Sequence, residues 1–118
     1  MASTLPAGEL LTLESLVTPT AQGIASRVLA RTAAGNITLF AFDAGEELSE
    51  HTAPFDALVL TLSGALTLTI GGTPVHTAPQ TIVRMPANIP HAVLAIEPSR
   101  MLLVMLREPP SQGSASAT

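Results

Sequence analysis

Glycine and proline residues divide this chain into short segments rich in β-branched and other apolar residues. The chain has 8 Gly and 10 Pro among its 118 residues, and such breaks at intervals of about ten residues are typical of all-β folds. Residues 65–70 (ALTLTI) alternate strictly and end at Gly71-Gly72, a hairpin signal. The spacing predicts an all-β sandwich or barrel of eight to ten strands. The expected strands are residues 21–33, 37–43, 48–53, 56–63, 65–70, 73–77, 82–85, 91–96 and 101–107.

The length is that of one domain. We expect an N-terminal arm over residues 1–20, a barrel over 21–108 and a disordered tail over 109–118. The apolar run 10–17 in the arm fits either a short helix or an edge strand.

Charged residues make up only 12% of the chain, against about 25% in an average protein. So few charges leave part of the surface to be covered by another subunit, and we expect a homodimer. The net charge is −4, the five Arg residues are scattered and the three aromatic residues are all Phe. This composition argues against nucleic-acid binding, which needs a basic patch or stacking aromatics.

The chain has no cysteine, which excludes disulfides, thiol catalysis and thiolate metal sites. Its longest apolar run, residues 101–106, is far too short to span a bilayer, and no basic amphipathic helix suggests membrane binding. The first thirty residues lack the pattern of a secretory signal. We therefore expect a cytoplasmic protein.

Two stretches carry most of the chain's candidate chemistry. In residues 45–64 (GEELSEHTAPFDALVLTLSG), five residues separate a Gly from His51, and a strand then leads to a second Gly. In residues 80–95 (QTIVRMPANIPHAVLA), Pro86 precedes His91 by five positions. In order and spacing the two stretches resemble the paired motifs of the cupin superfamily, over roughly residues 35–107. The resemblance implies a double-stranded β-helix (jelly-roll) barrel, often dimeric, whose interior metal is held by three His and one Glu.

Carried over by position, the family's ligand set is half present. His51 and His91 stand at two of the histidine positions, whereas Ala53 and Ala57 stand at the positions of the other histidine and the glutamate. A transition-metal site normally needs three or more protein ligands. Asp56 is the nearest substitute, but strand alternation turns Asp56 outward if Ala57 faces inward, unless a bulge re-aims it.

The remaining chemically active side chains have simpler interpretations. We expect His76 to be exposed and Arg84 to point outward and pair with a carboxylate, although an inward Arg84 would bind an anion. Three methionines are expected to fill the core, namely Met85, Met101 and Met105. The glutamates before His51 are expected to lie in a solvated loop, namely Glu46, Glu47 and Glu50.

Three functions fit these residues. The first is a barrel that binds a small organic molecule in an interior pocket, with His51 and His91 as polar handles and Val59, Val93, Leu66 and Leu68 as apolar lining. The second is an enzyme of dioxygenase, isomerase or decarboxylase type. In it His51 and His91, with Asp56 as a further candidate, hold a divalent Fe, Mn, Ni or Zn, or one histidine acts as a general base without metal. The third is a structural or regulatory dimer with a vestigial pocket.

Overall fold

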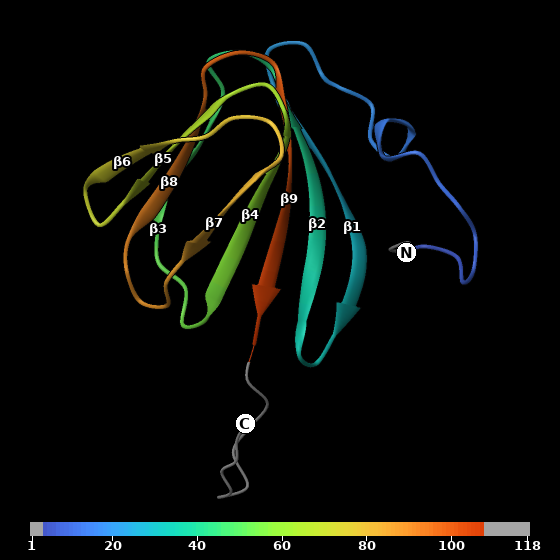
Figure 1. Ribbon diagram of the computed structural model, residues 1–118. Helices are drawn as coiled ribbons and strands as arrows, with labels where there is room; N and C mark the ends of the chain where they lie inside the picture. The colour runs from blue at the N-terminus through green and yellow to red at the C-terminus, as the bar shows by residue number, and fades with distance from the viewer. Residues whose placement is uncertain (1–3, 108–118) are drawn as a thin grey trace, which may run out of the picture.

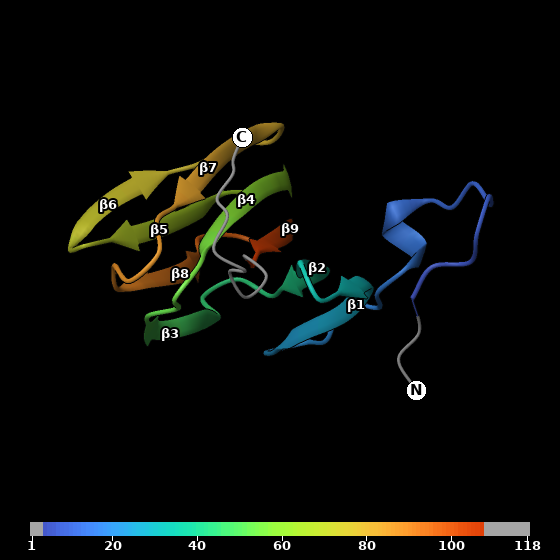
Figure 2. The same ribbon diagram turned by 90° about the horizontal axis from the view of Figure 1, so that it is seen from below.

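The computed structural model describes residues 4–107 and contains nine β-strands over that range. They form two antiparallel sheets that face each other (Figures 1 and 2). One sheet has the order β1-β2-β9-β4-β7, and the other has the order β3-β8-β5-β6. The strands are β1 (Ile24–Thr32), β2 (Gly35–Phe42), β3 (Glu47–His51), β4 (Asp56–Ser63), β5 (Leu66–Ile70), β6 (Thr73–His76), β7 (Thr81–Met85), β8 (His91–Ala95) and β9 (Ser99–Leu106).

The all-β barrel prediction is confirmed, and each expected segment overlaps one strand. The segment 56–63 agrees at both ends, because an apolar row on β4 alternates with a more exposed one. The last strand begins at Ser99, two residues earlier than expected. Ser99 pairs with Phe42 across the sheet, and its buried hydroxyl donates to the Glu97 carbonyl at 2.7 Å.

The main core lies between the sheets and is made of inward rows from both. Val59 and Val93 are 1% exposed, and Met85 and Met101 belong to the same cluster. Met105 packs against it, so the role expected for the three methionines is confirmed. The cluster comprises Phe42, Ala57, Val59, Leu66, Leu68, Met85, Val93, Ala95, Met101 and Leu103.

The N-terminal arm resolves an ambiguity of the sequence. It contains one 3₁₀ turn (Leu13–Ser15), called η1, and Leu16 and Val17 then pack on the outer face of β1 and β2 in a second cluster with Leu29 and Leu39. The sequence of this segment sustains neither a helical nor a strand period. Its conformation therefore depends on the contact with the sheet. The expected tail at 109–118 and the first three residues of the expected arm lie outside the described residues.

Short loops bring several strand ends to one end of the barrel, which lies at the bottom of Figure 1. Residues 52–55 join the end of β3 to the start of β4, and residues 86–90 join β7 to β8. β9 also ends here, since Leu106 pairs with Asp56. A hydrogen bond of 2.7 Å from the Asn88 amide to the Ala53 carbonyl ties the two loops together. We call this region the open end.

Candidate functional site at the open end

His51 and His91 meet at the open end, as cross-strand neighbours in the register of β3 and β8. Their Nε2 atoms are 3.1 Å apart, and their rings meet edge to face with centroids 4.4 Å apart. His91 is only 4% exposed because it belongs to the inward row of β8. His51 is exposed at the end of β3. The structure thus brings together the two histidines that the motifs single out.

Backbone contacts favour the same tautomer in both rings. The His51 Nδ1 atom lies 2.9 Å from the Ser49 carbonyl oxygen, and the His91 Nδ1 atom lies 3.2 Å from that of Ile89. A carbonyl oxygen only accepts hydrogen bonds, so each Nδ1 must carry the proton that is donated. If both rings are neutral, the Nε2 lone pairs face each other across 3.1 Å, and a proton shared by the two nitrogens or a donor from outside the pair is needed to satisfy them.

Burial and a neighbouring charge act on His91 in the same direction. Removal from water lowers the pKa of His91, and a positive charge on His51 would lower it further. The hydrogen bond to the Ile89 carbonyl opposes this shift without reversing it. His91 is therefore suited to act as a neutral hydrogen-bond acceptor near neutral pH.

The donor set at this site does not fit a resident metal ion. Ala57 is buried on the inward row of β4 at the glutamate position, and Ala53 follows β3 at the position of the second histidine. Within residues 4–107 no group of three or more His, Asp or Glu side chains could hold a metal ion. Two imidazoles fall short of the three ligands that such sites need.

Asp56 does not join the histidines. Its carboxylate accepts one hydrogen bond from Arg84 and one from the Ala87 amide, each at 2.8 Å. The Ala87 amide contributes most to lowering the pKa of Asp56, and Arg84 adds to the effect. The outward, carboxylate-paired Arg84 expected from the sequence is confirmed. Both carboxylate oxygens are engaged, so Asp56 anchors the β7–β8 loop and does not offer a metal ligand.

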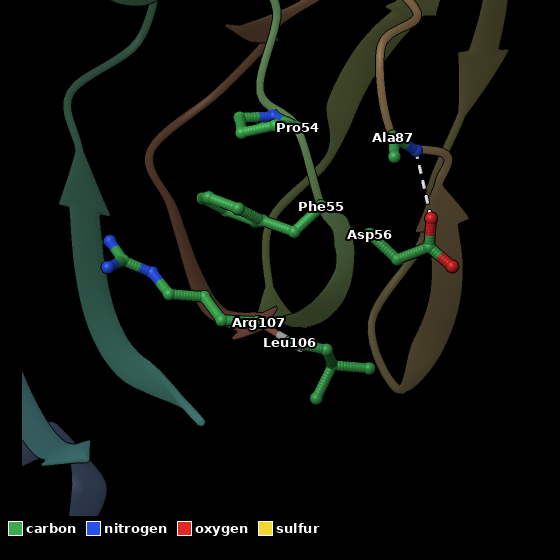
Figure 3. A pocket seen from close by; sticks show the side chains of 6 residues that line it. All are labelled: Pro54, Phe55, Asp56, Ala87, Leu106 and Arg107. Carbon is green, nitrogen blue, oxygen red and sulfur yellow. Dashed lines mark hydrogen bonds between the residues drawn. The ribbon is translucent and has the colours of Figure 1, made fainter. Parts of the chain in front are cut away.

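A hollow of about 720 Å³ opens at the same end, beside Asp56 (Figure 3), and its lining does not include His51 or His91. Of the six residues that line it, sequence reasoning singled out only Asp56, and Phe55 and Arg107 are among those it missed. Arg107 continues the inward row of Leu103 and Met105, and Phe55 precedes the inward row of β4 by two positions. Counting the alternation past the strand ends would have found both. The hollow is lined by Pro54, Phe55, Asp56, Ala87, Leu106 and Arg107.

The other predicted site residues lie elsewhere. Val59 and Val93, like Leu66 and Leu68, are core residues at 0–1% exposure, so a contact with a ligand stays a prediction for them. His76 is exposed on β6, as expected, and its Nδ1 lies 3.1 Å from the Thr67 hydroxyl. Glu47 and Glu50 are exposed as expected, but they belong to β3 and not to a loop, because β3 pairs with β8 from Glu47 onward.

Comparison with known proteins agrees with this architecture. The family model of the cupin domain matches residues 38–106, so the chain belongs to the cupin family. A conserved protein of unknown function from Streptococcus pyogenes is 34% identical, with 91% of this chain and 94% of that one covered and a TM-score of 0.84. A cupin superfamily protein from Desulfitobacterium hafniense is 29% identical, with coverages of 92% and 99% and a TM-score of 0.82. No curated protein matches the sequence.

The backbone preserves the family motifs where the side chains depart from them. Gln80 and Asn88, which replace two glycines of the second motif, both have positive φ, of 66° and 64°. This left-handed conformation favours glycine, and asparagine is among the residues that tolerate it.

No helix within residues 4–107 has the length and apolar character needed to cross a membrane.

Proposed function

We propose that this chain is a small-molecule-binding cupin barrel in which the His51–His91 pair receives a hydrogen-bond donor of the ligand. The observation that supports this is the separation of 3.1 Å between two Nε2 atoms whose Nδ1 partners are carbonyl oxygens. Two acceptors this close leave no room between them, so a ligand hydroxyl would approach from the side of the pair and direct its proton toward both nitrogens.

The surroundings favour an organic ligand. His91 is flanked in the sheet by Ile70 on β5, and the Ile89 side chain is 38% exposed close by in the chain. The hollow at the same end lies within the range of 300–1,000 Å³ that is usual for small-molecule sites.

The test is a fragment screen by NMR that compares hydroxyl-bearing compounds with their methyl counterparts. We expect hydroxyl compounds to shift the imidazole nitrogen signals of His51 and His91. His51→Ala removes one acceptor and should weaken their binding about fivefold or more, because a hydrogen bond contributes about 1 kcal/mol. His76→Ala is the matched control, since His76 lies on the exposed edge strand β6, and it should leave the affinity unchanged.

Two results would overturn the proposal. One is a screen in which no hydroxyl compound binds better than its methyl counterpart. The other is near-stoichiometric Fe, Mn, Ni or Zn in untagged protein that disappears in the His51→Ala, His91→Ala double variant. Such metal would favour the metal-dependent enzyme instead.

A further inference from the structure

Arg107 brings a positive charge to the mouth of the barrel. It follows β9 in phase with Leu103 and Met105, which pack in or against the core, so its side chain starts from the inward row. Its backbone amide donates to the Ala34 carbonyl at 2.7 Å, which fixes the main chain just after β9. Arg107 is exposed there and lines the hollow at the open end.

The guanidinium is oriented by an aromatic ring and not by a carboxylate. Its central carbon lies 5.1 Å from the centroid of the Phe55 ring, within the range of a cation–π contact. The only ion pair within residues 4–107 joins Arg84 and Asp56. A cation–π contact with the face of Phe55 uses the charge of the guanidinium and occupies none of its N–H donors with an acceptor atom.

The negative charge in the hollow is already neutralised. Figure 3 shows Asp56 turned toward Ala87 on one side of Phe55, whereas Arg107 extends on the other side. Arg84 and the Ala87 amide engage both oxygens of Asp56. Of the charged groups at the hollow, Arg107 therefore remains as the site for an anion, and Pro54, Phe55 and Leu106 supply apolar walls.

We propose that the ligand of this barrel is a small organic hydroxy acid whose carboxylate is bound by Arg107 beside Phe55. The carboxylate part is argued from Arg107 and the hollow alone, and the hydroxyl part rests on the function proposed for His51 and His91. A planar guanidinium matches a carboxylate with two parallel hydrogen bonds, which a lysine cannot reproduce. The apolar walls receive the body of the acid.

Three compounds separate the two parts of this proposal: 4-(hydroxymethyl)benzoate, its uncharged amide, and 4-methylbenzoate, which lacks the hydroxyl. Dissociation constants are measured by calorimetry or NMR titration on the full chain. The acid should bind wild type about tenfold or more tightly than the amide, as expected for a charge-assisted hydrogen bond. Arg107→Gln should abolish this preference, and Arg107→Lys should retain only part of it.

Arg31→Gln is the matched control, because it removes the same charge from an exposed position near the end of the edge strand β1. It should change the affinity for the acid by less than about twofold. A wild type that binds acid and amide equally, or an Arg107→Gln variant that keeps the preference, would overturn the carboxylate site. If His51→Ala leaves the preference of the acid over 4-methylbenzoate intact, the histidine proposal fails while the Arg107 site stands.

Discussion

Two residues at the open end, His91 and Asp56, have lowered pKa values for different reasons, and they therefore respond to acid in different pH ranges. His91 is buried with its Nε2 against that of His51, so a second proton at this pair would place two cations in contact. Asp56 accepts hydrogen bonds that lower its pKa, and its protonation therefore belongs to a more acidic range.

The lowered pKa of His91 predicts that the free energy of unfolding falls as the pH drops below about 6.5, the usual pKa of a histidine. The pKa of His91 is lower in the folded chain than in the unfolded chain. Below about pH 6.5 the unfolded state thus binds more protons, and the free energy of unfolding falls as the pH drops toward the folded pKa. Urea unfolding between about pH 7.5 and 5 should show this fall. His91→Gln should remove most of it, whereas a His76→Gln chain that loses the slope equally would contradict this assignment.

Gly64 gives a second prediction at the residue scale. Its φ is +80°, and a Cβ built there would collide with the Ser99 hydroxyl and the Pro98 carbonyl. Gly64→Ala should lower the free energy of unfolding by about 2–4 kcal/mol, through backbone strain and overpacking together. Gly72 has a φ of +85° and open space around it, so Gly72→Ala should cost only about 1–2 kcal/mol. Equal losses in urea unfolding would show that the contact with Ser99 is unimportant.

Strands and their partners explain what could be predicted from the sequence. Strict alternation in β4 and β5 fixes both the strands and their inward rows, which is why Val59 and Leu68 were recognisable as interior residues. The two histidines were found by motif spacing, because that spacing reflects the register of β3 and β8. The N-terminal arm could not be predicted in this way, since its conformation depends on docking against Leu29 and Leu39.

Contacts between elements also place polar groups in the core. The buried Thr61 hydroxyl on β4 donates to that of Thr77 at 2.9 Å, and the Leu66 amide at the start of β5 donates to the same Thr77 oxygen at 3.2 Å. Thr77→Val removes this acceptor and should lower the free energy of unfolding by about 1–3 kcal/mol. Thr73→Val, at an exposed position of β6, should change it by less than about 0.5 kcal/mol. Chemical denaturation of both variants tests the difference, and equal values would contradict it.

The molecule as a whole consists of two β-sheets and an N-terminal arm, and few of its residues are charged. The arm covers part of the outer face of the five-stranded sheet. Strand β7 forms one edge of that sheet, and its residue Ile82 remains 58% exposed. The homodimer expected from the low charge content stays a prediction at this scale. Light scattering after size exclusion should give about twice the chain mass of 12.1 kDa. A mass of one chain at micromolar concentration would contradict it.

The proposed function depends most directly on the protonation state of the two rings. A long-range proton–nitrogen NMR spectrum of the imidazoles near neutral pH reports which nitrogen of each ring carries the proton. We expect protonated Nδ1 atoms in both His51 and His91, with Nε2 signals that change together on addition of a hydroxyl-bearing ligand. A ring with its proton on Nε2 and a bare Nδ1 would remove the converging acceptors and contradict the proposal.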